Sequence, residues 1–347
     1  MRHLITGGSG FVGNLVARRL RERGEEVRIL DIWADPSRPK DIEYVETSVL
    51  NREGVAATMR SVDVVHHNAA LVAQTNAGKA YWDVNVEGTR IVIEEAAKVG
   101  VKAVVHVSST AAYGIPPEGA ITAETPLQPV EPYGKSKRAG ELVAEELCVT
   151  HQIPLITIRP RATLGAGRLG IFQVLFEWIK ENRNVYVIGS GNIKFQFIHA
   201  HDLIDFYMLA LDTAKTGTYN VGTSQFGTLR GGLEDLIRYA GSSSQVKSLP
   251  EHLTIGALRL LYWLHVSPLV PWHYLTYHKA CYFDVKPLLQ MGWRPKYSNA
   301  DMLRESYDWY CANAKDTKAG RIPGGTTGSP HRSPLKQGVL WLVKLAS

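Results

Sequence analysis

The sequence predicts an α/β fold, a doubly wound parallel sheet with a smaller C-terminal lobe interleaved with it. One observation is that short β-branched runs alternate with helical patterns over the first half of the chain. That alternation is typical of a parallel sheet covered by helices on both faces. A second is that a glycine-rich run, residues 6–13, joins the first strand to the first helix.

The elements of the first half follow in order as strands and helices. Strands are expected at 4–5, 27–30, 42–45, 62–66, 103–107 and 155–158, and helices at 11–23, 87–99 and 133–151. Gly24 ends the first helix, since glycine is favoured just past a helix C-terminus.

After Arg159 the pattern changes to frequent Gly, Pro and aromatic residues. Helices are expected at 171–180, 202–214 and 299–313, and a strand at 218–221. The division that follows is a sheet domain at 1–165 with late elements returning near 185–222, a second lobe mainly at 166–313, and a flexible tail at 314–347. The tail ends in a short apolar segment, 338–345, too short to span a bilayer. We expect it to dock on the protein itself or on a subunit, with membrane-surface contact as the alternative.

Composition excludes several classes of protein. The 347 residues are 45% hydrophobic and 21% charged, as in an ordinary globular chain, and the net charge of +6 comes with no nucleic-acid motif. Cys148, Cys281 and Cys311 are too scattered for a disulfide framework or a zinc site, so no metal is expected. The N-terminus leaves no room for a signal peptide and no run of 18 apolar residues occurs, so we expect a cytoplasmic protein.

The glycine run predicts a dinucleotide site of the Rossmann type. In such a run one glycine allows a tight turn, one lets the backbone approach a pyrophosphate, and one allows close packing of helix on sheet. Gly7, Gly10 and Gly13 are placed for these tasks, with Phe11 and Val12 opening the helix whose positive end faces the pyrophosphate.

Asp31 ends the second strand, where an acidic side chain accepts hydrogen bonds from the adenosine ribose. A carboxylate there would also repel a 2′-phosphate. The sequence therefore predicts NAD rather than NADP.

Tyr133 and Lys137 form a Tyr-x-x-x-Lys pair at the start of a helix. Residues at this spacing share one helical face, so the ammonium can lower the phenol pKa and make Tyr133 a general acid/base. Ser109 follows the strand at 103–107, where a hydroxyl can face a cleft.

Together these features resemble the extended short-chain dehydrogenase/reductase superfamily, in its group of epimerases, dehydratases and 3β-hydroxysteroid dehydrogenases. The resemblance covers residues 1 to about 313. The motifs that carry it, besides the glycine run and Asp31, are Asp63, His67-Asn68-Ala69-Ala70, Asn85-Val86-Glu87-Gly88-Thr89, Ser109, Tyr133-Gly134-Lys135-Ser136-Lys137, Arg159-Pro160 and Phe197-Ile198-His199.

The resemblance implies roles for these residues. Tyr133 would be the acid/base, Lys137 would hold the nicotinamide ribose, and Ser109 would hydrogen-bond the reacting oxygen. The further cofactor contacts that it implies are Phe11, Val12, Ser48, Ala69, Ala70, Asn85 and Pro160. Ser48 stands where relatives carry an aspartate, so it would be a weaker acceptor for the adenine. Relatives often form dimers, so a homodimer is expected.

The reaction stays open between alternatives. Dehydratases of this group carry Asp-Glu where this chain has Thr110 and Ala111, so dehydration is disfavoured. Nucleotide-sugar epimerases often carry an Arg where this chain has Phe195, although Lys279 or Arg161 could substitute for it.

The region 253–277 is rich in Leu, Trp and Tyr, and most of these residues are expected in the core of the second lobe. A lobe of this composition suits an apolar substrate. We therefore expect an NAD-dependent oxidoreductase acting on a secondary alcohol or ketone of a steroid- or lipid-like molecule. The alternatives are a nucleotide-sugar epimerase with tightly bound NAD and a non-catalytic NAD-binding module.

Overall fold

A seven-stranded parallel sheet forms the centre of the protein in this computed structural model, which describes residues 1–73, 77–115, 118–264, 269 and 271–318. Its strand order is β10-β6-β5-β4-β1-β2-β3. The strands are β1 (Arg2–Thr6), β2 (Glu26–Asp31), β3 (Glu43–Glu46), β4 (Val64–His67), β5 (Ala103–Val107), β6 (Leu155–Pro160) and β10 (Gly217–Val221). The order reverses between β1 and β4, and in such sheets ligands bind in the crevice beyond the carboxyl ends of these strands.

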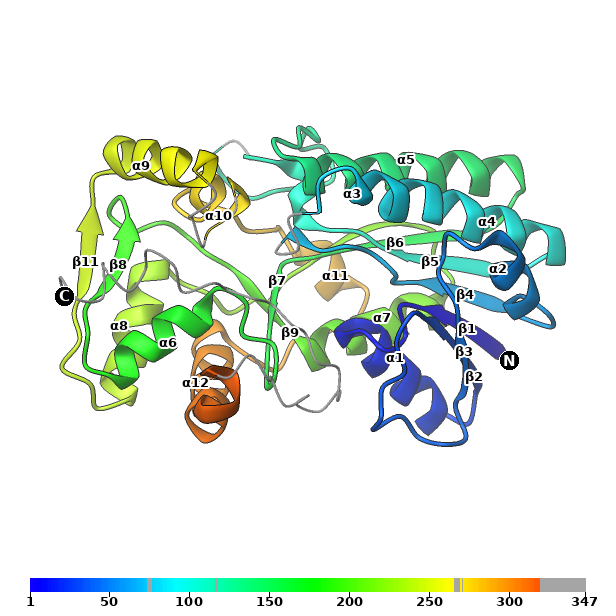
Figure 1. The fold of residues 1–347 in the computed structure, drawn as a ribbon, viewed down its shortest axis with the longest axis horizontal. Coiled ribbons are helices and arrows are strands. Elements are labelled where there is room, and N and C mark those ends of the chain that lie inside the picture. The colour runs from blue at the N-terminus through cyan, green and yellow to red at the C-terminus, as the bar shows by residue number, and fades with distance from the viewer. Residues whose placement is uncertain (74–76, 116–117, 265–268, 270, 319–347) are drawn as a thin grey trace.

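Helices cover both faces of the sheet, as Figure 1 shows. On one face lie α1 (Phe11–Glu22) and α7 (Ala200–Thr213), which contact each other; on the other lie α2 (Arg52–Thr58), α4 (Gly88–Val99) and α5 (Pro132–Thr150). Apolar side chains such as Val16 and Ile204 fill the first layer, and Val92 and Ala144 fill the second. Both faces are therefore buried, as the β-branched strand sequences predicted.

The second lobe is built around smaller pieces of sheet. β7 (Ala162–Leu164) pairs with β9 (Phe197–His199), and β8 (Val185–Ile188) pairs with β11 (Val246–Leu249). The helices of this lobe are α6 (Phe172–Lys180), α8 (Leu229–Tyr239), α9 (Glu251–Trp263), α10 (Pro271–Thr276) and α12 (Asn299–Lys318). Its core is aromatic, with Phe172, Phe195 and Phe197 in edge-to-face contacts.

The α/β fold expected from the sequence is confirmed. In the first half α2 (Arg52–Thr58) is a helix that was not expected, and the other main differences lie in the second half. Within the region 185–222, β10 joins the central sheet, whereas β8 pairs with β11 in a separate sheet. The last helix is interrupted at its expected end by non-helical backbone angles at Asn313 (φ −114°, ψ 15°), after which a further helical stretch runs to Lys318. Residues 319–347 lie outside the described part of the chain. The helix α9 contains no buried residue, although the apolar region 253–277 was expected mostly in the core. Among the described residues, no helix is both long and apolar enough to cross a bilayer.

Candidate active site

Tyr133 stands in the first turn of α5, at the carboxyl edge of the sheet. Glu131 caps this helix, because its carboxylate accepts hydrogen bonds from the backbone N–H of Tyr133 (2.8 Å) and of Gly134 (2.6 Å). Pro132 occupies the first turn, where its missing N–H costs nothing. The sequence Glu-Pro-Tyr-Gly therefore begins the helix at a defined residue and orients Tyr133.

Ser109 lies two residues after the end of β5, where its side chain is near enough to Tyr133 to act on the pKa of the phenol. The Ser109 Oγ also accepts from the Ala111 N–H at 3.1 Å, which fixes its rotamer. Burial raises the pKa of Tyr133 to about 12, while the Ser109 side chain and the charge of Arg168 act to lower it. At neutral pH the phenol is thus protonated in this structure.

Lys137 lies one turn further along α5, and its ammonium donates a 2.7 Å hydrogen bond to the Val107 carbonyl at the end of β5. Burial lowers the pKa of Lys137 to about 8. The sequence led us to expect that this ammonium lowers the Tyr133 pKa; instead burial raises that pKa, and the cation that acts against the rise is Arg168. Spacing predicted the shared face but not the degree of burial.

A buried ion pair fixes α5 against the sheet. Arg159 on β6 donates from Nε and Nη2 to the two carboxylate oxygens of Glu141, each at 2.7 Å, and from Nη1 to the Tyr113 hydroxyl at 2.9 Å. Glu141 lies on α5 two turns beyond Tyr133 and is fully buried. The pair thereby sets the rotation of the helix that carries Tyr133 and Lys137.

The glycine run forms the turn between β1 and α1. Gly7 has φ +66°, and a Cβ there would lie 2.7 Å from the Ala69 backbone, so this position requires glycine. A Cβ on Gly13 would lie 2.3 Å from the Gly7 carbonyl oxygen, which explains the close approach of helix and strand. A Cβ on Gly10 would lie 3.1 Å from the Gly7 carbonyl oxygen, and no other non-neighbouring atom of the described residues would lie within 4 Å of it. Space therefore remains above the N-terminus of α1.

Asp31 and Ser48 lie at the neighbouring corner, after the adjacent strands β2 and β3. The Asp31 carboxylate accepts from the Ser9 N–H (3.0 Å), within the glycine run, and from the Ile32 N–H (2.7 Å). Burial raises the Asp31 pKa, and these N–H donors partly offset the rise. The Ser48 hydroxyl accepts from the Leu50 N–H at 3.2 Å.

The loop after β4 completes this edge. The Ala69 N–H donates to the Thr6 hydroxyl at 3.3 Å, and Ala70 follows it half-buried. Asn85 is buried in a short π-helical turn (Asp83–Glu87), where its side chain bonds both the N–H (2.8 Å) and the carbonyl (3.1 Å) of Leu71. Asn85 thus holds the loop after β4 in place through hydrogen bonds to the loop backbone.

The family comparison decides what this arrangement belongs to. The model of the NAD dependent epimerase/dehydratase family matches residues 3–222, which contain the glycine turn, Asp31, Ser109, Tyr133 and Lys137. The chain belongs to this family. It is an extended short-chain dehydrogenase/reductase enzyme, and its cofactor is NAD.

Relatives of this family member span most of the chain. An uncharacterized protein, y4nG, of Sinorhizobium fredii is 37% identical over 99% of this chain and 85% of its own length. A 3-beta-hydroxysteroid dehydrogenase of Mycolicibacterium neoaurum is 27% identical over 65% of this chain and 64% of its own. The Thermus thermophilus UDP-glucose 4-epimerase, solved with NAD, superimposes with a TM-score of 0.73 at 25% identity, covering 90% of this chain and 99% of that one.

The residues expected to bind NAD in this epimerase/dehydratase family member lie along one edge of its sheet. Phe11 and Val12 open α1, Pro160 ends β6, and Tyr133 and Lys137 lie on α5. The remaining positions lie at or after the ends of β1, β2, β3 and β4, with Asn85 in the π-helical turn that supports the loop after β4. The open space at Gly10 and the acceptor at Asp31 fit a dinucleotide laid across this edge. The described residues contain no cluster of His, Cys, Asp or Glu able to hold a metal.

Sequence reasoning missed four residues of this site: Glu131, Glu141, Tyr113 and Arg168. The Glu131-Pro132 pair, a capping acid before a proline, is a local signal that could have identified the first of them. Arg168 comes close to Tyr133 because the turn at residues 165–168 folds back, placing its guanidinium 5.3 Å from the centre of the Phe11 ring. No local pattern predicts that position.

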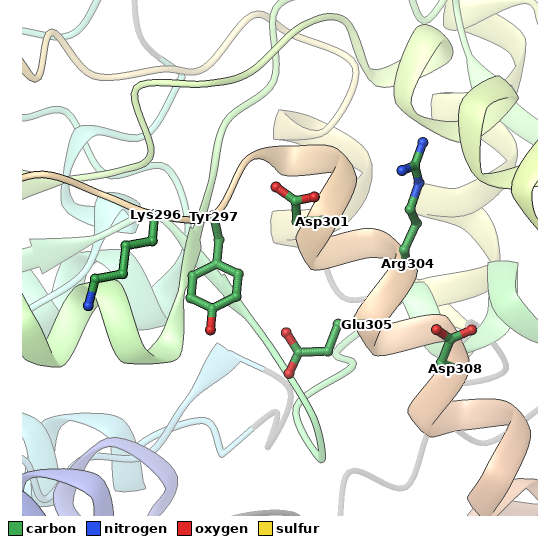
Figure 2. Close-up of a pocket in the computed structure, with 6 residues that line it drawn as sticks. All are labelled: Lys296, Tyr297, Asp301, Arg304, Glu305 and Asp308. Atoms are coloured by element: carbon green, nitrogen blue, oxygen red, sulfur yellow. The ribbon is translucent and has the colours of Figure 1, made fainter.

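A hollow beside α12 is not part of this site. Figure 2 shows its side chains, and Glu305 there pairs with His199 at 2.9 Å and Lys296 with Asp205 at 2.9 Å. None of the expected catalytic or cofactor residues lines it. Its charges are typical of a solvated helix face.

Replacement of Asp31 by alanine tests the ribose contact. We expect the NAD affinity to fall about tenfold, because a hydrogen bond to a charged group is lost, and we expect the preference for NAD over NADP to shrink. Calorimetric titration with both dinucleotides measures this, with Asp41→Ala as the control for an exposed aspartate. Unchanged affinity and preference would contradict the assignment.

Proposed function

We propose that this enzyme transfers a hydride between NAD and the carbon of a secondary alcohol or ketone. The observation that carries the proposal is that Ser109 after β5 lies near enough to the Tyr133 phenol to act on its pKa, with Lys137 held one turn further along the same face of α5. Bound NAD supplies the hydride acceptor. In the reductive direction the protonated Tyr133 would give its hydroxyl proton to the carbonyl oxygen that Ser109 holds; in the oxidative direction the phenol must first lose its own proton, and the phenolate then takes the proton of the alcohol. The Lys137 ammonium, fixed by the Val107 carbonyl, holds the nicotinamide ribose.

We also propose that NAD binds along the carboxyl edge of the sheet. Gly7, Gly10 and Gly13 would let the pyrophosphate approach α1, and Asp31 would accept from the adenosine ribose. The remainder of the NAD site would be lined by Phe11, Val12, Ser48, Ala69, Ala70 and Pro160. Asn85 would hold in place the loop that carries Ala69 and Ala70.

The substrate we favour is largely apolar, of the steroid or lipid kind. Phe195 is buried at the position where epimerases often carry an arginine. The possible substitutes are engaged elsewhere: Arg161 donates to the Gln196 carbonyl (3.1 Å) and to Cys281 Sγ (3.0 Å), and Lys279 pairs with Glu251 at 2.7 Å. A diphosphate would lack these strong partners.

Elimination of water from a sugar is disfavoured by the residues next to Ser109. Thr110 donates its hydroxyl proton to the Pro160 carbonyl at 2.6 Å, and Ala111 carries no acid or base. A second acid/base pair is therefore missing where dehydratases of this group have one.

A nucleotide-sugar epimerase is the second candidate, and Arg168 is the observation that favours it. Its guanidinium acts on the pKa of Tyr133 by charge and lies above Phe11, at the start of the pyrophosphate helix. A cation at that place would suit an anionic group of a sugar nucleotide. The likeness to a UDP-glucose 4-epimerase points the same way.

The two candidates differ in what they do with NAD. We expect the purified protein to carry little NAD and to release NADH, seen at 340 nm, when given NAD and one of a panel of hydroxysteroids. An epimerase would instead retain NAD through purification, shown by absorbance and mass, and would change the configuration of a UDP-hexose without net NADH. That second result would overturn the apolar assignment while keeping the hydride step.

The setting of the enzyme belongs to the same proposal. A cytoplasmic location is supported by three cysteines that are free, two of them buried. A homodimer is supported by the family resemblance, and light scattering of the purified protein tests it. Contact of the C-terminal segment 338–345 with a membrane surface falls on residues outside the described ones, and its support is sequence alone.

A further inference from the structure

The helix α9 presents an apolar stripe to solvent. Leu253, Leu260, Trp263 and Leu264 recur at helical spacing and are 76%, 56%, 73% and 50% exposed. Figure 1 shows α9 at the outer edge of the second lobe, with α10 on its inner side, and the two helices are in contact. A large exposed apolar patch of this kind marks an interaction surface.

The helix α9 buries less of its apolar surface than α8, the helix before it in the chain. In α8 the apolar residues Leu233, Leu236 and Ile237 are buried. In α9 no residue is buried: Ile255, Leu258 and Leu261 are half-buried, and a second apolar set, Leu253, Leu260 and Trp263, is exposed. Burying an apolar face normally stabilises an amphipathic helix, so the outward stripe has its favourable partner elsewhere.

The charges around the stripe identify the chemistry of that partner. His252 and Arg259 are exposed along one edge of the stripe. The acidic residue at the start of the helix, Glu251, is neutralised by Lys279 at 2.7 Å and lies 3.3 Å from His278. An apolar stripe bordered by an arginine and a histidine, with a tryptophan near its end, is the pattern of a helix lying in a membrane interface.

We propose that α9 docks on an anionic lipid surface, with its apolar stripe in the headgroup region. Stable attachment to a bilayer takes two weak signals. The sequence after Lys318 offers the second: it holds four Lys or Arg residues, no Asp or Glu, and the apolar run 338–345. A twofold contact between two copies is less suited to the stripe, because it would bring two arginine-bearing borders into one interface.

Sedimentation with lipid vesicles tests the proposal. The full chain is mixed with phosphatidylcholine vesicles, with or without phosphatidylglycerol, and the bound fraction is measured at low and high salt. We expect binding to the anionic vesicles that weakens with salt. The affinity of the double variant Leu260→Glu/Trp263→Glu for anionic vesicles should fall at least about tenfold, because the variant places negative charge at the interface. Val149→Glu, at a 79% exposed position on α5, should bind like the unaltered protein.

Each other outcome overturns the proposal. Failure of the unaltered protein to bind anionic vesicles does so directly. If the α9 variant binds vesicles as well as the unaltered protein does, and the variant Leu340→Glu/Leu342→Glu no longer binds them, the contact belongs to the C-terminal tail. A larger oligomer that the α9 variant breaks up, without vesicle binding, assigns the stripe to a second copy. NAD titration verifies that each variant is folded, and Leu253→Glu replaces the double variant if that one fails to fold.

Discussion

Replacing Tyr133 with phenylalanine is expected to lower kcat about 1,000-fold, because the hydroxyl that moves the substrate proton is lost. The ring and its burial stay the same, so the helix cap at Glu131 and the NAD site are undisturbed. NADH formation at 340 nm, with the substrate that the panel identifies, gives the rate. Titration with NAD should show an affinity close to that of the unaltered enzyme.

A matched control separates this effect from the loss of any nearby hydroxyl. The Tyr81 ring centre lies 5.9 Å from that of Tyr133, but its hydroxyl donates to the backbone carbonyls of Val72 and Ala73. Tyr81→Phe should therefore change kcat less than about tenfold, the scale of one lost hydrogen bond. Turnover retained in Tyr133→Phe would remove Tyr133 as the acid/base.

Replacing Arg159 with methionine is expected to lower the free energy of unfolding by about 3–5 kcal/mol. The variant leaves the Glu141 carboxylate buried without the bidentate guanidinium that compensates it. Denaturant unfolding measures the loss. Arg21→Met, which breaks an exposed ion pair with Asp41, should cost less than about 1 kcal/mol. Similar losses in the two variants would contradict the structural role of the buried pair.

The same pair predicts how stability depends on pH. Arg159 holds the pKa of Glu141 below its usual value of 4.5. A lowered pKa in the folded state means that the stabilisation is present above pH 4.5 and is lost as the pH falls through the folded-state pKa. The stability of Glu141→Gln, measured by denaturant unfolding at several pH values, should therefore decline less steeply below pH 4.5 than that of the unaltered protein.

The sheet and the main catalytic candidates could be predicted because their signals are local. Gly7, Gly13 and the Tyr133–Lys137 spacing each lie within a few residues of the element they define. The Glu141–Arg159 pair joins a helix to a strand 18 residues later, and its geometry depends on how they pack. Composition identified the apolar region 253–277 but neither the helix α9 within it nor which way its side chains face, since that depends on how α9 packs against α10.

The edge strand β10 comes much later in the sequence than its neighbour β6, so the two halves of the chain form one folding unit. Between β6 and β10 the chain leaves for the second lobe, forms β7, α6, β8 and β9, and returns through α7. Farther along, the Trp293 indole N–H donates to the Asp202 carbonyl on α7 at 3.1 Å, a second long-range tie. The edge of the sheet can therefore close only after a long loop has been ordered, which costs chain entropy and slows folding. A fragment ending at residue 165 would lack both the edge strand and the helix beneath it, so evolution could vary this lobe more readily by local substitution than by exchanging it whole.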